Sequence, residues 1–285
     1  MKIAIRYEAV YQYEEKAGFS PHLVRLIPRQ DVFTFVDRIH LATDSSADIQ
    51  YRQDLFDNMV ATCFYPEPLD RLEYRLELDV RLQPRNPFHF LLDAHALRLP
   101  FEYTEDETAA LGNYCRIRAE TGPLPAALDR PARAVPTVEA LVAMNGWLHK
   151  NIAYERRDEG DPHPPAETLR RQSGSCRDYA VLFVEVLRRH GLAARLASGF
   201  LWENEDSASP RRAENALHAW VETYLPGAGW IGMDPTNGVF CDHHFLPAAV
   251  GLSPRDIAPV LGHYYGDRTI GSTLETTLSI TETPI

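Results

Sequence analysis

The chain lacks any apolar run close to the about 20 residues that a membrane-spanning helix needs. Its first residues, MKIAIRYEAVYQYEEKAG, also lack the continuous apolar stretch of a secretion signal. We therefore expect a cytoplasmic protein without a membrane partner. Basic residues are few, since 29 Lys and Arg stand against 40 Asp and Glu and the formal net charge is −11. Because charges of both signs are interspersed, nucleic acid is not an expected partner.

Cysteine is scarce as well, with four in 285 residues and no CxxC pair: Cys63, Cys115, Cys176 and Cys241. Structural disulfides are therefore not expected. Cys241 lies close to His243 and His244, but Cys-x-His-His does not have the spacing of a structural zinc site. Adjacent histidines on a strand would also point to opposite faces. We expect no bound metal and no cofactor.

The pattern of apolar and polar residues predicts a first half that is rich in strands. Apolar residues make up 45% of the chain and charged residues 24%, which is enough apolar material for a folded core. Residues 3–13, IAIRYEAVYQY, alternate apolar and polar side chains and predict a half-buried strand. Segments at 33–43, 58–67 and 72–84 have the same character. Short strands at this spacing predict a β-sandwich over about residues 1–125.

The pattern changes after residues 121–137, a segment rich in Pro and Ala that we interpret as a domain boundary. Apolar residues at helical spacing predict a helix over 138–152, with Thr137 as its N-cap. Residues 155–168 are rich in Pro and charge and predict a surface loop, followed by a short helical stretch, AETLRRQ. The predicted fold class is therefore α+β: the sandwich, a core of mixed helix and strand over 130–262, and a final strand within 263–285 that packs back on the body.

Cys176 lies at the start of another predicted helix, within RQSGSCRDYAVLFVEVLRRH (171–190). Its side chain belongs to the apolar stripe of that helix, whereas the more polar positions are left mostly outside: Arg177, Glu185, Arg188 and Arg189. Unpaired amides and the positive end of the helix dipole stabilise a thiolate at a helix start. Taken alone, Cys176 could equally be a small buried apolar residue. Its setting favours a nucleophile whose own N–H acts as an oxyanion donor.

A nucleophilic thiol needs a base and a group that holds the base in one tautomer. Residues 216–225 alternate, so His218 and Trp220 share one face, and a Pro-Gly turn follows. A hairpin centred on Pro226 would set His218 opposite Asp234 and Trp220 opposite Gly232. A turn centred on Gly227-Ala228 would instead place His218 and Asp234 on opposite faces and exclude the pair.

Three further residues have two interpretations each. Asp178 could orient the base, but it lies in the first turn of a helix, where a carboxylate is stabilised in any case, so a structural role is favoured. Gln172 is a candidate oxyanion donor or only the end of a short helix. Trp220 is a candidate contact for the substrate or the oxyanion.

These motifs resemble the transglutaminase-like superfamily, which has a papain-like cysteine core. The resemblance rests on GSCRDYAVLFVEVLRRHGLAARLASGFL, on HAWVETYLPGAGWIGMDPTNG, and on the order Cys, His, Asp. It implies that Cys176 is the nucleophile, His218 the general base and Asp234 the orienting carboxylate. YEAVYQYEEKAGFSPHLVRLIPR and DNMVATCFYPEPLDRLEYRLELDV resemble the N-terminal region that precedes this core in bacterial transglutaminase-like cysteine proteases. Arg177 departs from the pattern, which has Gln after the cysteine.

We therefore expect a cysteine peptidase or amidase that acts on a peptide or protein amide through an acyl-thioester. Because the triad itself does not decide between water and an amine as acceptor, an amine-accepting acyltransferase is the first alternative. A non-catalytic binding protein that keeps the fold is the second.

Overall fold

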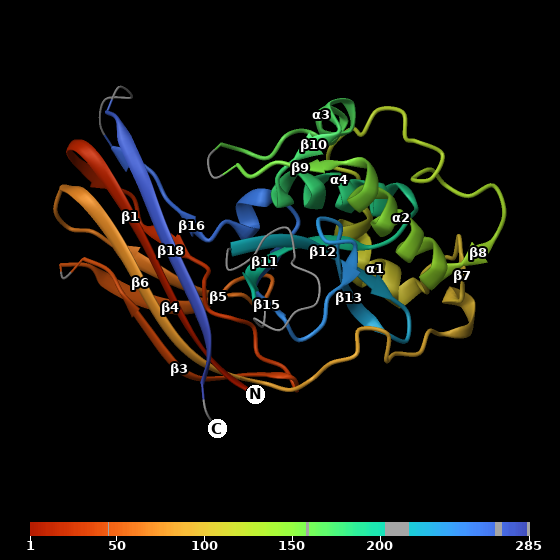
Figure 1. The fold of residues 1–285 in the computed structure, drawn as a ribbon, viewed down its shortest axis with the longest axis horizontal. Coiled ribbons are helices and arrows are strands. Elements are labelled where there is room, and N and C mark those ends of the chain that lie inside the picture. Colours follow the sequence, from red (N-terminus) through yellow and green to blue (C-terminus); the bar gives the residue numbers. More distant parts are fainter. Residues whose placement is uncertain (45, 158–159, 203–216, 266–269, 284–285) are drawn as a thin grey trace.

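The computed structural model describes residues 1–44, 46–157, 160–202, 217–265 and 270–283. Within these residues a strand-rich part lies beside a part that contains the α-helices (Figure 1). This arrangement confirms the predicted α+β class, with an N-terminal β-sandwich followed by a part of mixed helix and strand. No described helix has the length and apolar character that would let it cross a membrane.

Two antiparallel sheets form the sandwich. In the first, β1 (Lys2–Phe19) lies between β6 (Leu69–Leu82) and β18 (Ser272–Thr283), β3 (Thr34–Ala42) pairs with β6, and β17 (Tyr264–Tyr265) pairs with the end of β1. The second sheet has the order β16 (Val260–Leu261), β2 (His22–Val24), β5 (Met59–Phe64) and β4 (Asp48–Gln53). Alternate residues of β1, including Ile3, Ile5 and Tyr7, are buried between the sheets. The period-two pattern therefore predicted this strand correctly.

The last strand of the chain completes the sheet that the first strand begins. β18 runs antiparallel to β1, with Thr283 paired to Lys2 and Ser272 paired to Tyr13. Figure 1 shows the two strands side by side. From the same C-terminal region, β17 adds to the first sheet by pairing with β1, and β16 adds to the second by pairing with β2. The sandwich is therefore built from both ends of the sequence.

The second part is a five-stranded antiparallel sheet covered by helices. Its order is β14 (Val239–Phe240), β13 (Gly229–Asp234), β12 (Leu217–Leu225), β11 (Ala194–Leu201) and β15 (Phe245–Gly251). Helix α4 (Cys176–Arg189) packs on β11 and β12, and α1 (Glu105–Cys115), α2 (Thr137–Asn151) and α3 (Pro165–Arg171) contact α4. Phe200 and Leu246 of β11 and β15 pack into the sandwich core, so the two parts share an apolar contact.

The chain also contains short elements outside these sheets. β7 (Arg98–Leu99) pairs with β8 (Val135–Pro136), and β9 (Ala153–Tyr154) pairs in parallel with β10 (Ser173–Gly174). Of two 3-10 turns, η1 (Ala94–Ala96) precedes β7, and η2 (Pro254–Ile257) lies between β15 and β16. The predicted N-cap of α2 was wrong, because Pro136 is the capping residue and Thr137 begins the helix. The Thr137 hydroxyl instead donates to the Ala96 carbonyl at 2.6 Å and ties α2 to η1.

The prediction that Glu185 and Arg188 lie outside was also wrong, since each is 2% exposed. Arg188 Nη1 donates to Glu185 Oε1 at 2.6 Å, and the guanidinium also donates to the carbonyls of Tyr114, Ala194 and Leu252. The polar side of α4 is thus covered by α1 and by the segments around β11. Burial of a charged pair is acceptable where the partners satisfy each other's hydrogen bonds.

Candidate active site

The first turn of α4 presents Cys176. Ser175 is the N-cap, and its side chain and Asp178 form a reciprocal capping box. Cys176 as a whole residue is partly exposed, whereas the next turn of the helix is buried. The first amides of a helix and the positive end of its dipole favour a negative charge, and the thiol lies at this end of α4.

His218 and Asp234 come together from neighbouring strands, but not in the register that we predicted. β12 and β13 pair Val221 with Met233 and Glu222 with Gly232, so the hairpin is centred on Gly227 rather than on Pro226. Gly227 has φ +84° in this turn, a conformation that favours glycine.

The difference shifts the pairing by two residues, which keeps His218 and Asp234 on the same face as diagonal neighbours. His218 Nε2 and Asp234 Oδ2 are 2.9 Å apart. Both side chains are completely buried.

The Asp234 carboxylate is held by its own turn as well as by His218. The Thr236 amide donates to Oδ1 at 2.9 Å, and Asn237 Nδ2 donates to Oδ2 at 2.6 Å. Burial raises the pKa of Asp234, but the positive charge and hydrogen bond of His218, with these two donors, outweigh burial and lower it. Asp234 is therefore ionised. Sequence reasoning missed Thr236 and Asn237, although an Asp followed at two and three residues by such donors is the pattern of an Asx turn.

His218 has one nitrogen for each partner. Nε2 is taken by Asp234, and the buried Nδ1 is the nitrogen left to interact with the Cys176 thiol. Burial lowers the pKa of His218, but the Asp234 carboxylate and the contact with Cys176 outweigh burial and raise it to about 10. Burial likewise raises the pKa of Cys176, but the hydrogen bond and charge of His218 and a hydrogen bond from the Ala219 amide lower it overall. The raised pKa of His218 and the lowered pKa of Cys176 together favour a thiolate beside an imidazolium.

The other two predicted site residues, Trp220 and Gln172, lie in different surroundings. Trp220 is 1% exposed, and its ring stacks on His218 with the ring centroids 6.2 Å apart and the planes inclined by 24°. It covers the imidazole on the side where Phe245 also packs. Gln172 is exposed and ends α3 in the left-handed conformation, with φ 52°. Its place matches the interpretation as the end of a short helix, and the oxyanion role stays a prediction.

Residues 242–244 show why the argument from strand geometry failed for the adjacent histidines. They form a turn, and the rings of His243 and His244 lie with their centroids 4.3 Å apart. Asp242, rather than Cys241, joins them in a group that could hold a metal ion. His244 Nδ1 and Asp242 Oδ1 are already 2.9 Å apart, and His243 Nδ1 accepts from the Arg85 amide at 3.4 Å.

Two family models match this chain. The bacterial transglutaminase-like N-terminal region matches residues 3–105, and the transglutaminase-like superfamily core matches residues 127–235. Together they cover most of the sequence, including Cys176, His218 and Asp234. The chain belongs to the transglutaminase-like superfamily.

Curated relatives resemble part of the chain. An uncharacterized protein of Mycobacterium leprae is 31% identical over 128 residues, 45% of each chain. One of Mycobacterium tuberculosis is 29% identical over 135 residues, 46% of this chain and 43% of the relative. These matches span a little under half of the relatives' length. A protein-glutamine gamma-glutamyltransferase of Pseudomonas aeruginosa is 29% identical over 120 residues, 39% of this chain and 17% of that protein.

A solved structure shares the fold over the whole chain. The crystal structure of a candidate cysteine protease from Cytophaga hutchinsonii aligns with a TM-score of 0.68 and 16% identity, and covers 100% of this chain and 92% of that one. At this identity the likeness shows the fold alone. It agrees with the predicted arrangement of an N-terminal sandwich ahead of the cysteine-bearing core.

Proposed function

We propose that the protein is a cysteine peptidase or amidase that cleaves a peptide or protein amide. The observation that carries the proposal is the hydrogen bond of 2.9 Å between His218 Nε2 and buried Asp234, which leaves Nδ1 for the thiol of Cys176 at a helix start. A base held in one tautomer beside a thiol is the arrangement that nucleophilic catalysis requires.

The reaction would begin from the ion pair. The Cys176 thiolate attacks the amide carbonyl carbon, and the C=O electron pair moves onto oxygen. The Cys176 amide, in the first turn of α4, donates to that oxyanion. As the C–N bond breaks, the His218 imidazolium gives its proton to the leaving amine, and an acyl-thioester remains. Asp234 holds the imidazole ring in place throughout.

The second half of the reaction reverses the proton transfer. Neutral His218 takes a proton from an incoming nucleophile, which attacks the thioester carbonyl and releases the Cys176 thiolate. Water yields a carboxylic acid, and a primary amine yields a new amide. The similarity to a protein-glutamine gamma-glutamyltransferase favours the amine as the second candidate acceptor.

The test uses glutamine-containing peptides and a denatured protein as amide donors, with and without hydroxylamine. We expect carboxylic acid and free amine or ammonia from the wild type, and none from Cys176→Ala. Hydroxamate formed in preference to acid would instead assign the amine-accepting acyltransferase.

A chemically inert Cys176 would refute both enzymatic proposals. If no donor reacts and Cys176 is alkylated no faster than an ordinary thiol, a binding protein that keeps the fold becomes the better account. Cys176→Ala should have the same melting temperature as the wild type, so that lost turnover reports chemistry and not unfolding.

A further inference from the structure

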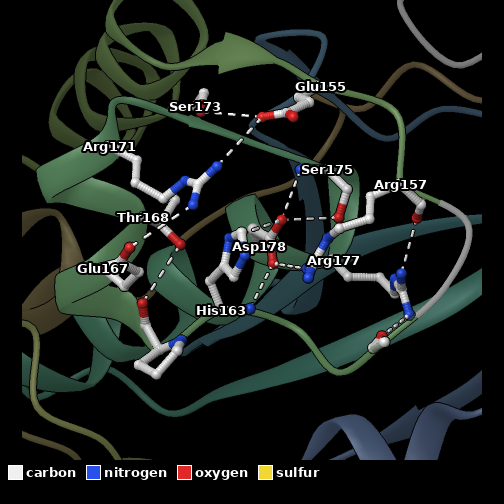
Figure 2. Close-up of polar contacts among 12 residues, drawn as sticks. Glu155, Arg157, His163, Glu167, Thr168, Arg171, Ser173, Ser175, Arg177 and Asp178 are labelled. Atoms are coloured by element: carbon white, nitrogen blue, oxygen red, sulfur yellow. Dashed lines mark hydrogen bonds and ion pairs between the residues drawn. The ribbon is translucent and has the colours of Figure 1, made fainter.

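Asp178 makes more contacts than a helix cap requires. Its carboxylate is completely buried, and each oxygen accepts two hydrogen bonds (Figure 2). Oδ2 accepts from the Ser175 amide at 2.7 Å and from the Ser175 hydroxyl at 3.0 Å, which closes the capping box. Oδ1 accepts from Arg157 Nη2 at 2.7 Å and from the His163 amide at 2.6 Å. The second oxygen therefore binds a different segment of the chain.

We propose that Asp178 is a positioning residue, which fastens the first turn of α4 to the segment that carries Arg157 and His163 and so fixes the Cys176 sulfur and amide. This inference rests on the proposed function, because it assigns Asp178 a role in presenting the nucleophile. A capping box alone would need only the contacts with Ser175.

Arg177 holds the same segment from the other side of the turn. Its guanidinium donates to the Gly160 carbonyl at 2.9 Å and to the Arg157 carbonyl at 2.8 Å. Both residues that follow Cys176 are therefore anchored to one stretch of chain.

The backbone that precedes Cys176 is packed against the same carboxylate. Gly174 of β10 pairs with Tyr154 of β9, and its carbonyl accepts from the Glu155 amide at 2.9 Å. A Cβ on Gly174 would lie 2.7 Å from the Asp178 Cβ. The chain on both sides of the nucleophile is thus held by contacts that meet at Asp178.

Asp178 could act on Cys176 through its negative charge or by holding the first turn of α4 in place. These two roles predict opposite effects of removing the carboxylate on the alkylation rate. Loss of a negative charge near the sulfur would by itself favour the thiolate and speed alkylation at low pH. Loss of the contacts that hold the first turn of α4 would move the sulfur away from His218, and would slow alkylation. A role in stability alone would lower the melting temperature and leave the pH profile of the folded protein unchanged.

The experiment measures the rate of Cys176 alkylation by iodoacetamide from pH 5 to 10, together with the melting temperature. We expect Asp178→Asn to slow the reaction at pH 6 about threefold, because one pH unit in the titration of the thiol lowers the thiolate about tenfold and the more basic thiolate regains about threefold. The double variant Asp178→Asn, Arg157→Met is expected to shift the profile in the same direction. It changes no net charge and leaves no unpaired guanidinium, so it provides a second test if the single variant does not fold.

The matched control is Glu167→Gln, Arg170→Met, which removes an ion pair from neighbouring α3 whose side chains are 32% and 72% exposed. It also changes no net charge and is expected to leave the profile unchanged. A faster or unchanged reaction in Asp178→Asn, or in the double variant if the single one does not fold, would overturn the proposal. An inert Cys176 in the wild type would refute the proposed function itself, which keeps the two failures distinct.

Discussion

Replacing His218 with alanine is expected to slow the alkylation of Cys176 at pH 7 about tenfold. In the wild type, the hydrogen bond and charge of His218 lower the pKa of the thiol against the effect of burial. Without the imidazole, burial remains and the pKa returns at least to its ordinary value of 9.0. At a pH two units below its pKa a thiol is about 1% ionised, so the fraction of thiolate falls by up to about 100-fold. The more basic thiolate is intrinsically more nucleophilic, with a Brønsted coefficient of about 0.4–0.5, which restores about tenfold.

The assay is iodoacetamide labelling over a pH series, followed by mass spectrometry of the cysteine peptides. Three other thiols serve as internal references in every sample: Cys63, Cys115 and Cys241. Burial raises the pKa of Cys63 to about 11 and also raises that of Cys115, so both should react slowly below pH 8. Coincident profiles for wild type and His218→Ala would refute the thiolate–imidazolium pair, as would a Cys176 profile like that of the reference thiols.

Two further changes test the charged contacts of the core. Glu185→Gln leaves Arg188 charged, with a completely buried side chain, and is expected to cost about 3–5 kcal/mol in urea unfolding. The exposed control Glu77→Gln should cost less than about 1 kcal/mol, and equal losses would contradict the argument from burial. Asp234→Asn is expected to lower kcat by about 10²–10⁴-fold. Because the carboxylate helps to raise the pKa of His218 to about 10, its loss should also move the alkaline limb of turnover to lower pH, and an unmoved limb would refute that assignment.

The sign of the pH dependence follows from the direction of each shift. The pKa of His218 is raised, so its contribution to stability is complete below its ordinary value of 6.5 and is lost as the pH rises through about 10. The pKa values of Cys176 and Asp234 are lowered, so their contributions are lost as the pH falls. Turnover through the ion pair should therefore decline at both ends of the range.

Much of the site could be predicted because it depends on local periodicity. Cys176 lies at a helix start because apolar residues recur at helical spacing directly after the small residues Ser173, Gly174 and Ser175. His218 and Asp234 share a face because an even shift in the register of a hairpin preserves the face of every side chain. The centre of the turn was wrong by one residue, and the pair still formed as diagonal neighbours.

Other features depended on contacts between segments far apart in the chain. The sequence by itself determined where strands and helices form and which of their faces are apolar, since these follow from the spacing of neighbouring residues. Only the tertiary structure decided that β18 pairs with β1, that the Glu185–Arg188 pair is buried, and that Asp178 binds Arg157. Each of these depends on which second segment packs on a given face. The pattern of residues within one segment does not indicate which other segment that will be.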